Sequence, residues 1–381
     1  MSIPYLITFQ PAGRFYFGTS QSFGEGFYAV SSMYPSQTTI IGTLRASILE
    51  KNDLLDLRTR LPISTMMNDV YPLTGKSEMK SLDEPGTDND FGKIVKLSPV
   101  FLVKRKDGAS YPDDFLFPVP EDVFDIDGLK LIDYPEEINV KTFSRQEEHN
   151  SSYHYDRRIK EPQAKYLGGI QFWQEYQAKK NFTFNNQYSI NNVFIPDSQP
   201  GIARKDRQTI EEYYYTKKDF RLSKEYSFGV IVYFSEENVL IDCDVFMGGE
   251  RSLFKMKLEK LPLSLPHIYK NHPIISRLIS ESDSNGDFDG SEDVSFIKEK
   301  LVLFSPFIGG DSSFKDLEFS LINDMYTPRS LNMRASKSDS FRVIPSGSVL
   351  FPGKILHKLT VNYPISSKIG YNFALKFFNG E

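Results

Sequence analysis

The sequence predicts an α+β protein that contains more sheet than helix. Aromatic residues make up 14% of its 381 residues, with 31 Phe and 21 Tyr, and aromatic side chains favour strands. Segments of alternating polarity recur along the chain, and one segment shows the apolar spacing of a helix. We therefore expect antiparallel sheets packed with helices. A chain of this length exceeds one ordinary core, so we expect two domains, with residues 1–150 in the first and 151–381 in the second.

The first half of the chain contains a strand pattern followed by a helix pattern. In residues 5–10, Tyr5, Ile7 and Phe9 point to one face of a strand, and Leu6, Thr8 and Gln10 point to the other, which predicts a half-buried strand. Ser36 can begin a helix whose apolar residues recur at helical spacing: Ile40, Ile41, Leu44 and Ile48. Residues 95–103 predict a strand interrupted at Pro99, whereas residues 107–137 are rich in Pro and acidic residues and predict loops.

The second half of the chain predicts further strands. Residues 228–234 are apolar at every position, as in a central strand. A tight turn at residues 248–251 leads into residues 252–258, where apolar residues alternate with two lysines, so one face of that strand is expected to be cationic. Residues 344–351 predict a turn that runs into a strand, and residues 371–378 predict a closing strand.

Residues 200–221 contain the most suggestive chemistry. The segment begins with Pro200-Gly201, a pair typical of turns, and residues 201–221 contain six cationic and four anionic side chains with three consecutive tyrosines at 213–215. Cations among aromatic side chains suit the binding of phosphates and the stacking of bases. A solvated surface segment has the same composition, so both interpretations stay open. A second cationic cluster lies near residue 154: Arg157, Arg158 and Lys160.

Composition and the absence of familiar motifs narrow the function classes. The net charge of −5 argues against a free-standing protein that binds nucleic acid through bulk charge, but it permits a local basic groove. Cys243 is the only cysteine, so an internal disulfide is excluded and a reducing compartment is expected. The sequence shows no signal peptide, no apolar run of membrane length and no phosphate-binding loop or dinucleotide fingerprint. Residues 281–293 are acidic but fail the calcium-loop pattern. We expect a soluble cytoplasmic protein without a metal or cofactor.

Four segments, taken in order, resemble one family. They are MYPSQTTIIGTLRASIL at residues 33–49, GIARKDRQTIEEYYY at 201–215, MGGER at 247–251 and PSGSVLF at 345–351. This order is similar to that of the third Cmr subunit, a repeat-associated mysterious protein (RAMP) of type III-B CRISPR effectors. Two features depart from the family pattern: no further glycine follows the Gly-Gly-Glu turn, and the final glycine-rich loop is reduced to Gly370-Tyr371.

The resemblance implies two ferredoxin-like (RNA-recognition-motif-like) domains with long insertions. It implies a non-catalytic subunit that binds the repeat-derived 5′ tag of the guide RNA, docks the large polymerase-like subunit and meets a backbone subunit. Eleven residues match the family motifs: Arg45, Gly201, Ile202, Arg204, Thr209, Gly248, Gly249, Glu250, Arg251, Ser346 and Gly347. The resemblance implies that all of them except Glu250 contact RNA. A purely structural role stays open for some, with Gly201 and Gly347 only turning the chain and Arg45 only pairing with a carboxylate. The cationic segments add Arg157, Arg158, Lys160, Lys205 and Arg207 to the residues expected to contact RNA.

Two other function classes remain open from the sequence. One is a metal-independent endoribonuclease that processes CRISPR repeat RNA, in which His154 acts as the general acid beside Arg157. The other is a cytoplasmic module that binds only proteins.

The acidic net charge is compatible with the leading hypothesis of a subunit buried in a larger assembly, because its partners can supply the remaining positive surface.

Overall fold

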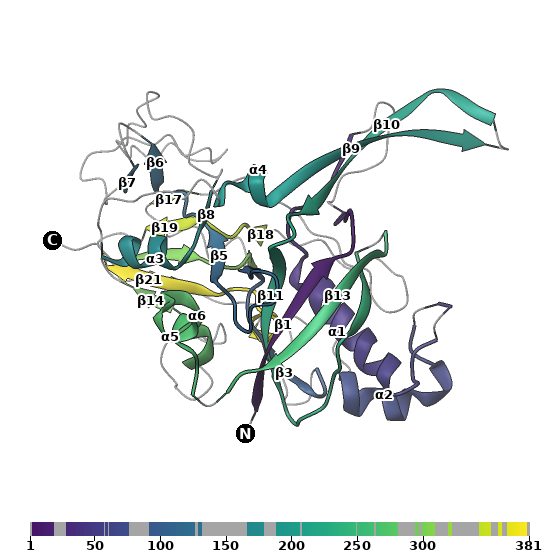
Figure 1. Cartoon of the computed structure of the whole chain (residues 1–381), viewed down its shortest axis with the longest axis horizontal. Helices are drawn as coiled ribbons and strands as arrows, with labels where there is room; N and C mark the ends of the chain where they lie inside the picture. Colours follow the sequence, from purple (N-terminus) through teal and green to yellow (C-terminus); the bar gives the residue numbers. More distant parts are fainter. Residues whose placement is uncertain are drawn as a thin grey trace.

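The described part of the chain forms a large antiparallel sheet, a smaller sheet and a projecting hairpin (Figure 1). The computed structural model describes residues 2–18, 28–56, 58–59, 61–75, 91–125, 129–131, 166–178, 188–205, 208–248, 250–262, 264–280, 294–296, 299–308, 319–321, 343–351, 357–359 and 364–378. No helix in these ranges has the length and apolar character needed to cross a membrane.

The large sheet has eight strands and forms the centre of the protein. Its order is β12-β13-β1-β11-β4-β5-β8, with β3 also paired to β11, and all of its pairs are antiparallel. The strands are β1 (Ile3–Pro11), β3 (Ile94–Leu97), β4 (Phe101–Lys104), β5 (Asp114–Pro118), β8 (Leu167–Gly168), β11 (Tyr226–Phe234), β12 (Cys243–Met247) and β13 (Ser252–Lys260). The sheet thus draws strands from both of the predicted domains, and the segment around residue 150 lies outside the described residues.

Strand β1 lies in the middle of this sheet, between β13 and β11. Leu6 points into one apolar cluster, whereas Ile7 and Phe9 point into another on the opposite face. The prediction of a half-buried strand at residues 5–10 is therefore wrong, because both faces of the sheet are covered here. The central strand predicted at residues 228–234 is confirmed in β11, where every one of these residues is buried.

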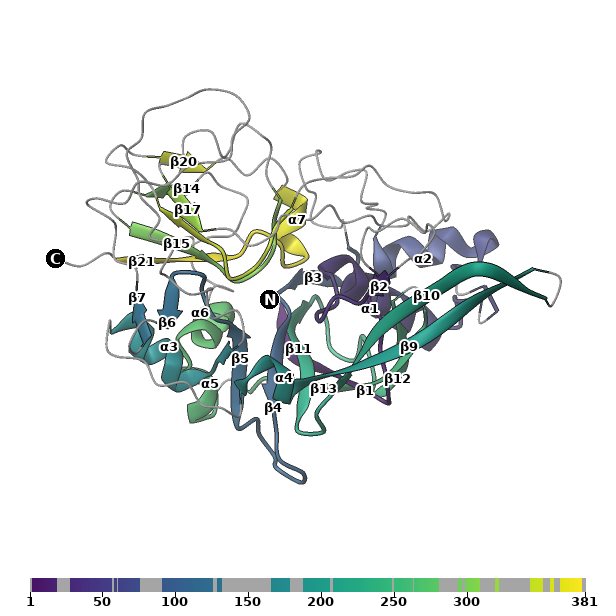
Figure 2. The ribbon, with the colours of Figure 1, turned by 90° about the horizontal axis from the view of Figure 1, so that it is seen from above.

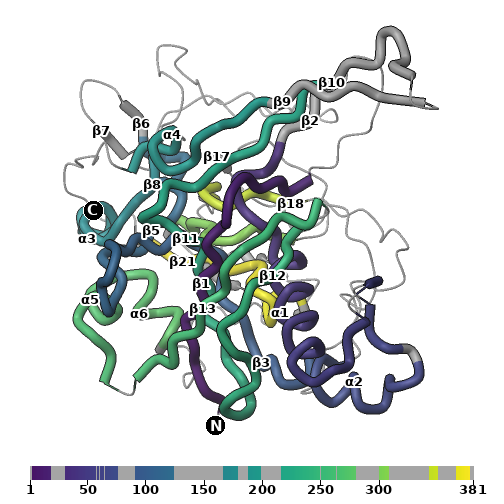
Figure 3. Tube along the Cα trace, turned by 45° about the vertical axis from the view of Figure 1, so that its right-hand side comes forward, coloured from purple at the N-terminus to yellow at the C-terminus, as the bar shows by residue number. Residues whose placement is uncertain are grey.

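Helix α1 (Gln37–Lys51) covers one face of the large sheet. The Ser36 side chain accepts a hydrogen bond from the Thr39 backbone N–H at 3.2 Å and so caps the helix, as the sequence predicts. Ile40, Leu44 and Ile48 are fully buried in the same cluster as Ile7 and Phe9 of β1. Figure 3 shows α1 beside β12.

The opposite face is covered by three short helices and by the smaller sheet (Figure 2). The helices are α3 (Ile170–Gln177), α5 (His267–Asn271) and α6 (Pro273–Ser280). The smaller sheet has the order β17-β19-β15-β21, with β15 (Glu299–Leu303), β17 (Phe319–Leu321), β19 (Val349–Phe351) and β21 (Ala374–Phe378). The remaining elements are η1 (Ser64–Met66), α2 (Met67–Thr74), α4 (Ile190–Val193), α7 (Pro364–Lys368), β6 (Val123–Asp125), β7 (Leu129–Leu131), β14 (Val294–Phe296), β16 (Phe307–Ile308), β18 (Val343–Ile344) and β20 (His357–Leu359).

A long hairpin projects from the body and carries the cationic segment; we call it the arm. It consists of β9 (Phe194–Lys205) and β10 (Gln208–Leu222), and β2 (Tyr28–Val30) pairs in parallel with β10 near the body. Figures 1 and 2 show the arm extending well beyond the sheets. The turn predicted at Pro200-Gly201 is wrong, since both residues lie within β9. Proline is tolerated there because β9 is the edge strand of its sheet.

The architecture is therefore mixed, with antiparallel sheets and few helices, as expected for an α+β protein. The loops predicted at residues 107–137 contain β5 and the β6–β7 pair, so that prediction is partly wrong. The closing strand predicted from residue 371 begins only at Ala374. The two ferredoxin-like domains and their boundary remain predictions.

Candidate nucleic-acid interface

The backbone pairing of the arm brings several of the predicted RNA-binding residues together. Arg204 lies opposite Thr209, and Lys205 lies opposite Gln208. Gly201 and Ile202 lie opposite Tyr215 and Tyr214, so the tyrosine segment shares the hairpin with the arginine segment. Cationic and aromatic residue types are thus concentrated on one projecting element.

The arm also contains an irregularity in its pairing. The register shifts between Thr209 and Tyr214, so that residues 210–213 of β10 stand opposite a single residue of β9, Ala203. A bulge of this kind locally interrupts the ladder and bends the strand. The bulge separates the distal pair Arg204–Thr209 from Tyr214 and Tyr215, which lie closer to the body.

Near the body, charged side chains hold the base of the arm. The Lys217 ammonium lies 2.9 Å from a Glu250 carboxylate oxygen, 3.4 Å from Asp219 Oδ1 and 4.5 Å from the centre of the Tyr16 ring. Burial acts to lower the pKa of Lys217, but its hydrogen bonds and attraction to Glu250 and Asp219 outweigh burial, so the pKa is raised. Burial raises the pKa of Tyr16. The positive charge of Lys217 is therefore paired with two carboxylates of the protein itself.

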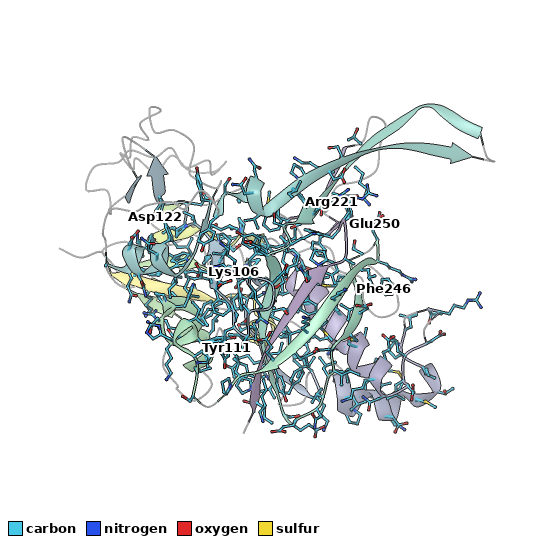
Figure 4. The ribbon with its side chains drawn as sticks, in the orientation of Figure 1. Lys106, Tyr111, Asp122, Arg221, Phe246 and Glu250 are labelled. Atoms are coloured by element: carbon cyan, nitrogen blue, oxygen red, sulfur yellow. The ribbon has the colours of Figure 1, made fainter. Side chains whose placement is uncertain are left out.

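A second charged group lies on the same arm, further toward its root. Arg221 of β10 donates to Asp197 Oδ2 of β9 from Nε at 3.2 Å and from Nη2 at 2.8 Å. Arg14, from the segment after β1, lies 3.8 Å from the same oxygen. Figure 4 shows Arg221 and Glu250 at the base of the arm. These contacts join the two strands of the arm to each other and to the body.

The turn between β12 and β13 lies against this base. Gly248 has a φ of +76°, and a Cβ at this position would lie 2.7 Å from the Tyr16 carbonyl oxygen, so the turn requires glycine here. The Arg251 N–H donates to the Gly248 carbonyl at 3.1 Å, and Arg251 has a φ of +53° and is exposed. The structure thus places the described residues of this turn, Gly248, Glu250 and Arg251, beside the arm, and Glu250 contacts Lys217 of β10.

Arg45 lies on a different element from the arm. Its guanidinium carbon stands 5.0 Å from the centre of the Phe91 ring, and burial lowers its pKa to about 10. Cation–ring stacking of this kind is a stabilising contact inside the body. The structure therefore brings the Arg251 turn and the arm together, whereas Arg45 packs on the Phe91 ring, and its contact with RNA stays a prediction.

The predicted turn at Ser346 and Gly347 lies between the two sheets. Gly347 has a φ of +88°, its carbonyl accepts the Glu121 N–H at 2.9 Å, and its own N–H donates to the Leu303 carbonyl at 2.7 Å. This turn joins β18 and β19 and packs against the segment that follows β5. The predicted turn-to-strand element at residues 344–351 is confirmed. Its positive φ explains why a glycine stands at position 347.

Five of the predicted RNA-binding residues and one alternative catalytic residue lie outside the described residues: Arg157, Arg158, Lys160, Arg207, Gly249 and His154. Of the residues that the structure does describe, no cluster of three or more His, Cys, Asp or Glu could hold a metal ion. Sequence reasoning missed the anchoring roles of Tyr16, Lys217 and Glu250. The signal was weak because these residues lie far apart in the chain. Lys217 belongs to the cationic segment and Glu250 to the Gly-Gly-Glu motif, but nothing in the sequence joins the two.

The fold and the candidate interface describe an antiparallel-sheet protein with an arm whose sequence is rich in cationic and aromatic residues. The family model described as "CRISPR-associated protein (Cas_Cmr3)" matches residues 7–273. The chain therefore belongs to the Cas_Cmr3 family, which confirms the family predicted from the four motifs. No curated protein matches the sequence.

Chains from solved type III CRISPR complexes align with this chain over nearly its whole length. A chain of the type III-B Cmr-beta complex bound to cognate target RNA has 13% identity and a TM-score of 0.47, with 98% of this chain and 96% of that chain covered. A chain of the Csm3–Csm4 subcomplex of a type III-A interference complex has 11% identity and a TM-score of 0.42, with 99% and 100% covered. Both similarities are low, and family membership rests on the family model.

Proposed function

We propose that the chain is the non-catalytic subunit of a type III-B CRISPR effector complex that binds the repeat-derived 5′ tag of the guide RNA. In this proposal it also docks the large polymerase-like subunit and meets a backbone subunit. Membership of the Cas_Cmr3 family supports the assembly. The observation that supports RNA binding most directly is the arm, whose backbone pairing sets Arg204 opposite Thr209 on a projecting hairpin that also carries residues 213–215.

The chemistry of the arm suits a single-stranded RNA of fixed sequence. Arginines can pair with phosphates, and tyrosines can stack on unpaired bases. A projecting hairpin offers both of its strands to a ligand without opening the core. Because the tag is shared by all guides, it can be bound largely through its shape and its backbone.

The first prediction concerns the cations of the arm. Replacing both Arg204 and Arg207 with Ala should weaken binding of tag-bearing RNA by about tenfold. The plot of log affinity against log salt should become less steep by about 1.4, since each phosphate contact on a single strand contributes about 0.7 to that slope. Fluorescence anisotropy at several salt concentrations with the full-length protein measures both quantities. A scrambled RNA of equal length reports the preference for the tag.

A matched control removes two positive charges elsewhere. Lys106 and Lys270 are exposed and lie off the arm, so the double variant K106A/K270A should bind tag RNA nearly as the wild type does. Equal losses in the two double variants would contradict the arm as the binding element.

Specific cleavage of repeat RNA by the purified protein, abolished by His154→Ala, would contradict the non-catalytic role.

A further inference from the structure

We infer that Glu250 is a positioning residue that aims the arm, acting through Lys217, and that it makes no contact with RNA. This inference rests on the proposed function, because it assumes that the arm is the RNA-binding element. It assigns the Gly-Gly-Glu-Arg turn two separate tasks: Gly248 brings the turn against the body, and Glu250 holds the arm.

The backbone around Glu250 is fixed to the body of the protein. Gly248 permits close approach to the Tyr16 backbone, and the Ser252 hydroxyl accepts the Tyr16 N–H at 3.2 Å. The Ala12 N–H donates to the Leu253 carbonyl at 2.9 Å. The turn is thus fixed to the segment after β1 on both sides of Glu250, so its carboxylate extends from a well-held backbone.

Lys217, the partner of Glu250, lies at the point where the arm leaves the body. Its ammonium lies among the Glu250 carboxylate, the Asp219 carboxylate and the Tyr16 ring, and its side chain is only 19% exposed. Further along β10, toward the body, Phe220 is buried in the core and pairs with Phe15 through two backbone hydrogen bonds. Lys217 therefore lies where the arm leaves the body, between the buried root and the projecting part.

The sign of the charge separates a positioning role from an RNA-contacting one. A carboxylate near bound phosphates weakens RNA binding by repulsion, so its removal alone should strengthen binding. A carboxylate that holds the arm in its binding orientation has the opposite effect, because its removal makes the arm adopt more orientations and lowers the population that can bind. A positioning role for Glu250 therefore predicts a loss of affinity upon a change that makes the protein more positive.

The chain offers a matched control for this change. Lys93 and Glu236 form an ion pair with the same separation of 2.9 Å, and their side chains are 28% and 56% exposed, against 19% and 54% for Lys217 and Glu250. Lys93 and Glu236 belong to neither the arm nor the turn. Glu236→Gln therefore removes the same charge from a similar pair without touching the arm.

The experiment measures the orientation of the arm and the affinity for RNA in the same variants. Spin labels at Thr209→Cys on the arm and Asn68→Cys on α2, in a Cys243→Ser background, report the distance distribution between the arm and the body by pulsed electron paramagnetic resonance. We expect a broader or shifted distribution in Glu250→Gln and in Lys217→Met. The distance distribution should stay unchanged from that of the labelled Cys243→Ser protein in two variants: Lys217→Arg, which keeps the cation, and Glu236→Gln.

In unlabelled full-length protein, Glu250→Gln should bind tag RNA about three- to fivefold more weakly, the range expected for a surface ion pair. Glu236→Gln should bind as the wild type does or slightly more tightly. An unchanged distance distribution in Glu250→Gln, or tighter RNA binding by that variant, would overturn the positioning role. If the wild type itself shows no preference for tag RNA, the proposed function fails, and the distance measurement still decides whether Glu250 aims the arm.

Discussion

His272 shows how one buried side chain can hold two elements together. Its Nε2 lies 2.9 Å from the Phe115 carbonyl of β5, to which it donates, and its Nδ1 accepts the N–H groups of Ile274 and Ile275 at 3.3 Å. The ring therefore caps the first turn of α6 while it is tied to the large sheet. This arrangement requires the neutral imidazole, and burial lowers the pKa of His272 to about 4.

The pH dependence of stability follows from this pKa. Because the folded-state pKa lies below the ordinary value of about 6.5, the stabilising contribution is complete above pH 6.5 and decreases as the pH falls toward 4. Between pH 7 and 4.5 we expect His272 to account for a loss of about 2–3 kcal/mol in the free energy of unfolding. Urea unfolding of the wild type and of His272→Asn, which keeps a capping side chain, measures how much of the pH-dependent loss of stability is due to His272. An equally steep loss in both proteins would contradict it.

At the scale of elements, the sequence predicts strands well where their burial is simple. Alternation in β13 and the continuous apolar run of β11 correspond directly to their places in the sheet. The alternation at residues 5–10 fails to show that β1 is buried on both faces, because Thr8 is polar yet nearly enclosed by neighbouring strands. Burial of that kind depends on partners that are distant in sequence.

The arm was harder to predict than the sheets. Its cations and tyrosines indicate a surface, and Pro196 and Pro200 argue against a strand, so residues 194–222 show no clear strand pattern. Both prolines are compatible with β9 because it lies at an edge and its partner β10 supplies the pairing. The sequence therefore indicated the segment of the candidate interface, whereas the hairpin that presents it, and its anchor at Glu250, required the fold.

The turn between β12 and β13 makes a prediction about its glycine. Gly248→Ala should lower the free energy of unfolding by about 2–4 kcal/mol, because it combines an unfavourable positive φ with a clash against the Tyr16 carbonyl. Gly108 has a φ of +78°, and a Cβ there would have no neighbour within 4 Å. Gly108→Ala should therefore cost only about 1 kcal/mol. Chemical denaturation compares the two, and equal costs would refute the close approach.

At the scale of the whole molecule, a buried ion pair joins its layers. Lys300 of β15 pairs with Asp122, which follows β5, and both side chains are almost completely buried. Tyr176 of α3 donates its hydroxyl hydrogen to this carboxylate, at 3.0 Å from Oδ2 and 3.1 Å from Oδ1, while the Lys300 ammonium lies 4.5 Å from the centre of the Tyr176 ring. The smaller sheet, α3 and the edge of the large sheet therefore meet at one polar cluster inside an apolar core.

This cluster supports a prediction about how the two sheets are held together. Lys300→Met leaves the Asp122 carboxylate buried without its cation, so we expect a loss of about 3–5 kcal/mol in the free energy of unfolding. The double variant Lys300→Met with Asp122→Asn removes both charges and keeps an acceptor for the Tyr176 hydroxyl, so it should be more stable than Lys300→Met alone. Urea unfolding of the two variants and the wild type measures both differences. If the double variant were the less stable of the two, the buried charge would not be the cause, and the sheets would depend on apolar packing alone.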